Sequence, residues 1–220
     1  MSKIKSIIFD LDGTLLDTLD DLTDSLNSVL EQFNLSTHTR EACRMMIGSG
    51  MDTLIRRAIP ENQFSQNLHS KVLEAMEKEY SQRWHIKTCI FSQIPETLDF
   101  LEQNNIMFSI LSNKPHNFTE LNVRKFFHKW NFRQVLGARK DFPKKPDPTQ
   151  ALLIAENTGT TPAETFFVGD SDVDMHTASN AKMISVGALW GFRSESELKA
   201  AGAKFLIKSP IELISLIADY

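Results

Sequence analysis

The sequence predicts an α/β protein: a Rossmann-like, doubly wound and mostly parallel sheet with an inserted all-helical cap domain. Short apolar runs rich in β-branched and aromatic residues alternate with amphipathic segments of helical period over much of the chain. Several of these runs end abruptly at polar turns, which is where sheets of this type bind ligands. One long interval, from about residue 34 to 87, has helical period and no convincing strand.

The elements of the first part follow from local patterns. Residues 3–9 are predicted to form a buried strand that leads into an acidic, glycine-containing turn. Asp17 is the expected N-cap of a helix that ends near Asn34 and carries leucines at helical spacing. Further amphipathic helices are expected at residues 40–47, 51–59 and 68–84.

After Pro95 the pattern becomes a regular alternation of helix, strand and polar turn. Ser194 and Glu197 form a predicted capping box. Strands are expected at residues 106–111, 133–136, 165–168, 183–186 and 204–207. Helices are expected at residues 96–103, 118–128 and 148–157, and after Ser171, Ser194 and Pro210. The predicted domains are a core of residues 1–15 and 89–220 and a helical cap of residues 16–88.

The amino-acid composition excludes several classes of protein and of partner. The 220 residues are 41% hydrophobic and 24% charged, which excludes disorder over most of the chain. The balance of 24 Lys and Arg against 28 Asp and Glu gives a net charge of −4, so neither nucleic acid nor an anionic membrane is an expected partner. No apolar run approaches the ~20 residues of a membrane span. We therefore expect a cytoplasmic protein.

Two carboxylates, Asp10 and Asp12, flank a leucine at the end of the first predicted strand. Alone, this segment is also consistent with a plain acidic turn. Two further carboxylates, Asp170 and Asp174, follow a later strand. Because four clustered carboxylates repel one another, they predict a bound cation, and all-oxygen ligation favours Mg²⁺.

Other strand ends and loops add polar groups, each with a simpler explanation. Ser112 and Asn113 follow the second strand and also fit an ordinary turn. Lys145 stands beside Lys144, as in a solvated basic loop. Asp170 and Asp174 also fit the cap and first turn of a helix, where the macrodipole favours acids.

Taken together and in this order, the motifs resemble those of the haloacid dehalogenase superfamily of aspartate-nucleophile phosphotransferases. The resemblance covers essentially the whole chain. Asp10 and Asp12 match the first family motif, Ser112 the second, Lys145 the third, and Asp170 with Asp174 the fourth. Gly48-Ser49-Gly50 with Arg57, and the later Leu-Trp-Gly-Phe-Arg segment ending at Arg193, are similar to the phosphoglycolate phosphatase branch.

The resemblance implies Mg²⁺-dependent hydrolysis of a small phosphate monoester, in the first place 2-phosphoglycolate to glycolate and phosphate. Asp10 is then the nucleophile that forms an aspartyl-phosphate, and Asp12 is the general acid and base. Lys145 and Ser112 bind the transferring oxygens. Asp174 orients Lys145 or a metal-bound water.

The same resemblance implies the remaining ligands and partners. Mg²⁺ is expected on Asp10, Asp170 and the backbone carbonyl of Asp12. Substrate contacts are expected from Thr14 and Asn113. Gly48 is a further candidate as part of an anion-binding turn, and Arg57 as a partner for a substrate carboxylate, although an ordinary helix-start turn and a solvated helix face also explain these two residues. The expected partner is a small phosphorylated metabolite, and the expected assembly is a monomer or a homodimer.

Other functions stay open at this point. Within the superfamily they are a phosphosugar mutase, a pyrophosphatase or a phosphatase of another small phosphate. From another class, a non-catalytic module that binds phosphate or metal would use the same fold. Lys182 and Gln93 depart from residues that are usual in the phosphoglycolate phosphatase branch, which weakens the substrate assignment and leaves the four motifs intact.

Overall fold

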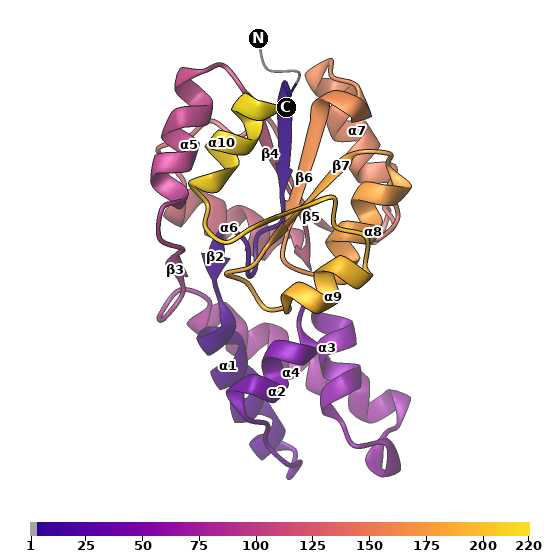
Figure 1. Ribbon diagram of the computed structural model, residues 1–220. Coiled ribbons are helices and arrows are strands. Elements are labelled where there is room, and N and C mark those ends of the chain that lie inside the picture. Colours follow the sequence, from indigo (N-terminus) through magenta and orange to yellow (C-terminus); the bar gives the residue numbers. More distant parts are fainter. Residues whose placement is uncertain (1–3) are drawn as a thin grey trace.

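The computed structural model describes residues 4–220, and its centre is a six-stranded sheet with helices on both faces (Figure 1). The strands are β1 (Ser6–Phe9), β4 (Met107–Pro115), β5 (Val135–Ala138), β6 (Thr165–Gly169), β7 (Ile184–Ala188) and β8 (Phe205–Ile207). They lie in the order β5-β4-β1-β6-β7-β8, and every neighbouring pair is parallel. The predicted parallel α/β class is confirmed. Lys3, where the first strand was expected to begin, lies outside the described residues.

Strand β1 lies between β4 and β6 in the sheet, and helices cover both of its faces. Ile7 and Phe9 pack with residues of α5 (Ile94–Gln103) and α10 (Glu212–Asp219). Ile8 points the other way, toward α7 (Thr149–Thr158) and α8 (Asp172–Asn180). A strand buried on both faces needs apolar residues at successive positions, which is the pattern of this segment.

The remaining core helices are α6 (His116–Phe126), α9 (Glu195–Ala200) and the 3-10 turn η2 (Pro162–Glu164). The Ser194–Glu197 capping box is confirmed at the start of α9. A second capping box joins Ser171 and Asp174 at the start of α8.

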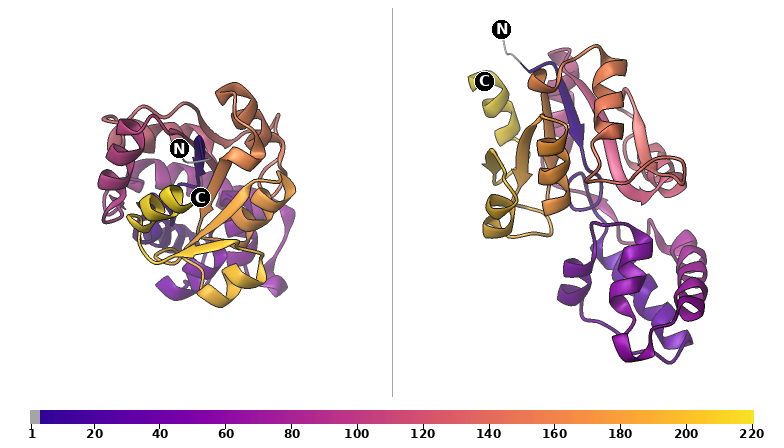
Figure 2. Two further views of the ribbon diagram at one scale, coloured as in Figure 1. Left: turned by 45° about the horizontal axis from the view of Figure 1, so that its top comes forward. Right: turned by 90° about the vertical axis from the view of Figure 1, so that its right-hand side faces the viewer.

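Four helices gather below the carboxyl edge of the sheet and form what we call the helical unit (Figures 1 and 2). They are α1 (Leu19–Gln32), α2 (Arg40–Met46), α3 (Met51–Ala58) and α4 (Gln66–Arg83), with a 3-10 turn η1 (Glu61–Gln63) between the last two. Leu26, Val29, Ile55, Val72 and Met76 belong to an apolar cluster that fills this unit and also includes Phe118 and Phe192 of the core. A short antiparallel pair, β2 (Leu16–Asp17) with β3 (Cys89–Ile90), joins it to the core.

Three local predictions are wrong. Leu16 and Asp17 form a strand, because their partner strand follows the helical unit and no local pattern announces it. Residues 112–115, expected as a polar turn, are the end of β4, whose pairing with β5 shifts register there. The N-cap of α1 is Thr18 in place of Asp17, although Asp17 Oδ1 accepts a hydrogen bond from the N–H of Leu19 at 3.2 Å.

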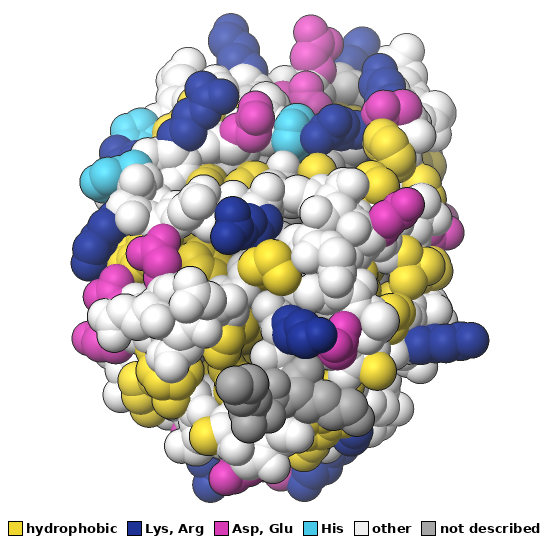
Figure 3. Space-filling view, turned by 90° about the horizontal axis from the view of Figure 1, so that it is seen from above, with side chains coloured by type: hydrophobic (Ala, Val, Ile, Leu, Met, Phe, Trp, Pro, Cys, Tyr) yellow, Lys and Arg dark blue, Asp and Glu magenta, His cyan; other side chains and the backbone are white. Residues whose placement is uncertain are grey.

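The face opposite the helical unit carries mixed charge. Figure 3 shows Lys and Arg side chains lying among Asp and Glu side chains over this face. Within residues 4–220, no helix combines the length and the apolar character that a membrane crossing requires.

Candidate active site

Three buried carboxylates meet at the carboxyl edge of the sheet. Asp10 follows β1, Asp170 follows β6, and Asp174 lies in the first turn of α8. Each offers an oxygen within 4.8 Å of the others, and none is more than 5% exposed. Because β1 and β6 are parallel and end at the same edge, Asp10 lies beside Asp170 and Asp174 although it is far from them in the sequence. We call this group the aspartate cluster.

Lys145 is the cation that faces the cluster. Its Nζ lies 2.9 Å from Asp10 Oδ1 and 2.7 Å from Asp174 Oδ1, and its side chain is 1% exposed. Asn113 holds the Lys145 backbone at both ends: Asn113 Oδ1 accepts from its N–H at 2.9 Å, and Asn113 Nδ2 donates to its carbonyl at 3.1 Å. Burial alone would lower the pKa of Lys145, but Asp10 and Asp174 raise it above its usual value, so the side chain is charged.

One lysine does not balance three buried carboxylates. Burial and then the charge of Asp174 raise the pKa of Asp10 to about 7, with Lys145 acting in the opposite direction. Burial, Asp174 and Asp10 raise the pKa of Asp170 to about 8. A shift in this direction means that the ionised forms lack compensating positive charge. The site therefore has the electrostatics of a cation site.

The Asp170 side chain is held by two hydrogen bonds and by close contacts with the backbone around it. Thr14 Oγ1 donates to its Oδ1 at 3.0 Å, and the Phe192 N–H donates to its Oδ2 at 2.7 Å. A Cβ on Gly13 or on Gly191 would overlap the Asp170 side chain, so both positions need glycine. Thr14, predicted as a substrate contact, is fully buried behind Asp170 and holds that carboxylate instead of lining the pocket.

Asp174 serves the helix and the site at once. Its Oδ2 accepts from the N–H and the Oγ of Ser171 at 3.1 and 2.6 Å, which closes the capping box of α8. Its Oδ1 holds Lys145. Both sequence interpretations, helix-start acid and site residue, therefore apply to Asp174.

Asp12 lies outside the aspartate cluster and belongs to a second polar group. Its Oδ1 is 2.9 Å from Lys114 Nζ, which also lies 2.7 Å from the hydroxyl of Tyr80 on α4. Burial alone would lower the pKa of Lys114, but Asp12 and Tyr80 raise it; burial raises the pKa of Tyr80 to about 12. The sequence analysis missed both residues. The available signal was the place of Lys114 directly after Ser112 and Asn113.

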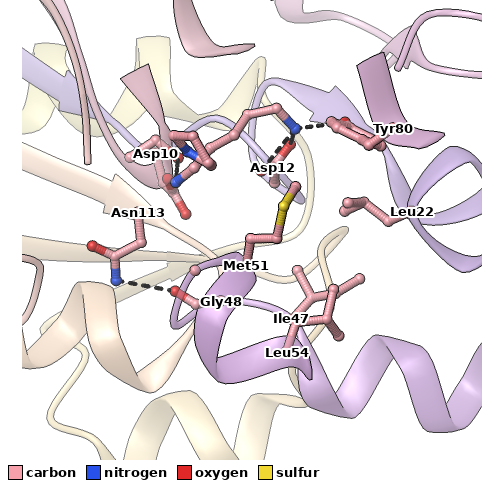
Figure 4. A pocket seen from close by; sticks show the side chains of 13 residues that line it. Asp10, Asp12, Leu22, Ile47, Gly48, Met51, Leu54, Tyr80 and Asn113 are labelled. Atoms are coloured by element: carbon pink, nitrogen blue, oxygen red, sulfur yellow. Dashed lines mark hydrogen bonds and ion pairs between the residues drawn. The ribbon is translucent and has the colours of Figure 1, made fainter. Parts of the chain in front are cut away.

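A pocket separates the carboxyl edge of the sheet from the helical unit (Figure 4). Asp10, Asp12, Ser112, Asn113, Lys114 and Pro115 line it from the core. Leu22, Ile47, Gly48, Gly50, Met51, Leu54 and Tyr80 line it from the helical unit and its loops. The side chains on the helical side are thus apolar except for one hydroxyl, whereas the core side is polar and charged.

The loop before α3 reaches this pocket, but Arg57 does not. The carbonyl of Gly48 accepts a hydrogen bond from Asn113 Nδ2 at 3.2 Å. Gly48 and Gly50 have φ values of 119° and 90°, a backbone region that favours glycine. Arg57, predicted as a substrate contact, instead donates to the carbonyl of Met46 at 2.8 Å and to Ser49 Oγ at 3.3 Å, and it lines a separate groove.

Arg193 ties the core to the helical unit, a function that the sequence analysis did not assign. Its guanidinium donates to the carbonyls of Arg44, Met45 and Ile47 at 2.8, 3.2 and 2.7 Å. These carbonyls belong to the last turn of α2 and the residue that follows it, where a cation is favoured. Any separation of the helical unit from the core near this point must break these hydrogen bonds.

The fold and the site define an α/β protein with a buried group of carboxylates and a lysine at the carboxyl edge of a parallel sheet. Residues 7–188 match the model of the haloacid dehalogenase-like hydrolases, and the chain belongs to this family. It is a phosphatase, that is, a hydrolase of phosphoric monoesters.

Individual relatives match over nearly the whole chain. The phosphoglycolate phosphatase of Vibrio parahaemolyticus is 30% identical over 220 residues, which cover 98% of this chain and 96% of the relative. That of Mannheimia succiniciproducens is 27% identical, with 98% and 99% covered. A crystal structure from Lactobacillus delbrueckii subsp. bulgaricus, described as a candidate phosphoglycolate phosphatase, has a TM-score of 0.91 at 29% identity and covers 99% of each chain.

Proposed function

We propose that the chain hydrolyses 2-phosphoglycolate to glycolate and phosphate, with Mg²⁺ and through an aspartyl-phosphate on Asp10. The observation that carries this proposal is the buried aspartate cluster with Lys145, which opens onto a small pocket next to Asp12. The names of the Vibrio and Mannheimia relatives support the choice of substrate.

Asp10 is the proposed nucleophile. Its carboxylate lines the pocket and is 5% exposed, so little water competes for it. A carboxylate oxygen would attack phosphorus while the bond to the substrate's bridging oxygen breaks, which divides hydrolysis into two displacements. Lys145 holds Asp10 in place and supplies positive charge. The Ser112 hydroxyl lines the same pocket and is available as a donor to the transferring oxygens.

Asp12 is the proposed general acid and base. In the first displacement its protonated carboxyl gives a proton to the leaving alkoxide. In the second, the resulting carboxylate takes a proton from the attacking water, which restores the starting form and releases phosphate from Asp10. The contact with Lys114 orients the Asp12 side chain at the pocket wall.

Asp10, Asp170 and the backbone carbonyl of Asp12 are the proposed holders of Mg²⁺. Hard oxygen donors, their burial and the raised pKa values of Asp10 and Asp170 fit a divalent cation. When bound, Mg²⁺ neutralises charge between the nucleophile and the phosphoryl oxygens. Asp174 has both oxygens engaged by Lys145 and Ser171, so we assign it the positioning of Lys145.

We further propose that residues 16–88 act as a cap domain over a core of residues 1–15 and 89–220. The apolar cluster that lies mostly within the helical unit and the narrow β2–β3 connection support this division. Closure of such a cap would exclude water from the pocket and confine a small substrate.

Phosphate release from a panel of small monoesters and pyrophosphate, with Mg²⁺ and with a chelator, tests the proposal. Asp10→Asn serves as the blank. We expect metal-dependent release that is fastest with 2-phosphoglycolate. A maximum at another ester would replace the substrate and keep the mechanism, whereas release that survives chelation would contradict the metal assignment. No release from any compound would favour a mutase or a non-catalytic module.

A further inference from the structure

The pocket contains a cation that the proposed mechanism uses only to orient Asp12. Among the side chains that line the pocket within residues 4–220, Lys114 is the one basic group. Its side chain is 3% exposed. A buried ammonium is costly unless it is paired, so its position next to the space for the leaving group calls for an explanation.

The ammonium of Lys114 has one N–H group that neither Asp12 nor Tyr80 needs. It has three N–H groups. Its Nζ lies 2.9 and 3.3 Å from the two oxygens of the Asp12 carboxylate, which one shared N–H can serve, and 2.7 Å from the Tyr80 hydroxyl, which takes a second. Figure 4 shows Asp12 and Tyr80 joined through these contacts at one side of the pocket. In the described part of the chain, the ammonium of Lys114 forms no hydrogen bond to a residue other than Asp12 and Tyr80. The third donor is therefore available to a ligand.

The arginines of this region are engaged elsewhere. Arg57 bonds to Met46 and Ser49, and Arg56 bonds to Glu61 at 2.6 Å and lies over the ring of Phe64. Arg193 donates to backbone carbonyls. A negative group on the leaving side of the substrate would thus find its partner in Lys114, in a desolvated pocket where a charge pair is stronger than in water.

We propose that Lys114 binds a carboxylate on the leaving group and makes the enzyme selective for phosphate monoesters of short hydroxy acids, with Tyr80 as a positioning residue for its ammonium. The proposal rests on the proposed function and names the residue that selects its substrate class. Asp12 must reach the bridging oxygen, and Lys114 lies one hydrogen bond beyond Asp12. In a 2-hydroxy acid ester, one carbon separates the bridging oxygen from the carboxylate, so both contacts are compatible with one small molecule.

The decisive experiment compares 2-phosphoglycolate with 2-hydroxyethyl phosphate, which has a hydroxymethyl group in place of the carboxylate. We expect the wild-type enzyme to prefer 2-phosphoglycolate. In Lys114→Met the ratio of the two kcat/KM values should fall by about 10-fold or more, mainly through a higher KM for 2-phosphoglycolate. Lys71→Met, which changes an exposed lysine of α4, should leave the ratio unchanged.

Two further variants separate recognition from folding. Lys114→Arg keeps a cation and should retain part of the preference. Tyr80→Phe keeps the buried ring and removes the hydroxyl that fixes the ammonium, and it should lower kcat/KM for 2-phosphoglycolate about 3-fold more than for the neutral ester. If Lys114→Met does not fold, these two variants decide the question.

Equal losses for both esters in Lys114→Met would overturn the proposal, because Lys114 would then act only through Asp12. Equal use of both esters by the wild-type enzyme would also overturn it and leave the phosphatase activity intact. If no ester is hydrolysed, the proposed function fails, and calorimetric binding of the same two esters still tests the inference. A preference for 2-phosphoglycolate that Lys114→Met abolishes would support it, whereas equal affinities would overturn it.

Discussion

The carboxyl edge of the sheet and the helical unit face the same pocket but bring different chemistry to it. The edge contributes buried charge, with Asp10, Asp12 and Lys114 in the pocket wall and Lys145 directly behind. The helical unit contributes apolar side chains and the hydroxyl of Tyr80. Charged groups are tolerated in the interior only when partners are held in place, and the parallel strands hold them. The helices supply the apolar wall of the pocket.

This difference separates two kinds of variant. Changes at the carboxyl edge should remove chemistry and leave the fold intact, whereas changes at the contact between the edge and the helical unit should alter substrate affinity.

Asp10→Asn should reduce turnover by at least about 10⁴-fold, because an amide of the same shape is a poor nucleophile. The measurement is phosphate release with saturating Mg²⁺. Circular dichroism and the melting temperature should remain close to those of the wild-type protein, since the substitution removes a buried charge from a repulsive group. Activity near the wild-type level in the purified variant would exclude Asp10 as the nucleophile.

Asp12→Asn should discriminate between leaving groups. Proton donation matters most for an alkoxide, so we expect a loss of about 10³-fold with an alkyl phosphate and a clearly smaller loss with an activated aryl phosphate. Steady-state kinetics with both substrates give the comparison. Equal losses would mean that activation of the attacking water limits both reactions, or that Asp12 does not act as the acid.

Arg193→Met should weaken the contact between the helical unit and the core. The variant keeps an apolar stem and loses the hydrogen bonds to the α2 end. We expect kcat/KM for a small ester to fall about 10-fold, mostly through KM, since a closed pocket forms less often. The control is Arg124→Met, which changes an arginine with a 76% exposed side chain. An unchanged KM would show that the contact does not govern closure.

Mg²⁺ should stabilise the protein more at high pH than at low pH. In the metal-free protein the pKa values of Asp10 and Asp170 are raised to about 7 and about 8, above an unfolded value of about 4. The folded state thus binds more protons than the unfolded state, and this contribution to stability is fully present below about pH 4 and lost as the pH rises through 7 to 8.

A cation offsets that loss, so the melting temperature with Mg²⁺ minus that with chelator should grow by about 4 °C between pH 5.5 and pH 8. Thermal unfolding at both pH values provides the measurement. Asp170→Asn should reduce the difference. A Mg²⁺ effect that is equal at both pH values, or larger at pH 5.5, would contradict the assignment of the cluster as the cation site.

Sequence patterns predicted most elements because those elements obey local rules. The apolar runs at β1 and β6 need both faces buried, and the capping box of Ser194 and Glu197 needs only residues that are three apart. Patterns failed where the partner is distant. The polar end of β4 has the residue types of a turn, and it is a strand because it pairs with β5. Leu16 has no local strand pattern and forms a strand through its pairing with Ile90.

The residues of the candidate site also fall into two groups, those that the sequence predicted and those that it did not. The structure brings Asp10, Asp12, Ser112, Lys145, Asp170 and Asp174 to the same edge of the sheet. The four aspartates follow a strand or lie at the start of a helix, whereas Ser112 lies near the end of β4 and Lys145 in the loop before α7. Thr14 and Arg57 were expected at the substrate, but the structure places Thr14 behind Asp170 and Arg57 outside the pocket. Lys114, Tyr80 and Arg193 were missed, since no spacing reveals that a strand residue will meet a hydroxyl from α4.

Hydrophobic period and turn chemistry act over a few residues, so the amino-acid sequence was enough to predict the parallel α/β class, the helical insert and the acidic motifs at the strand ends. Only the tertiary structure decided which side chains share the pocket, which carboxylates face Lys145 and which face Lys114, and what lines the helical side. The physical reason is that buried charges take their properties from neighbours brought together by folding. Their distances and pKa values are therefore properties of the assembled edge and not of any one segment.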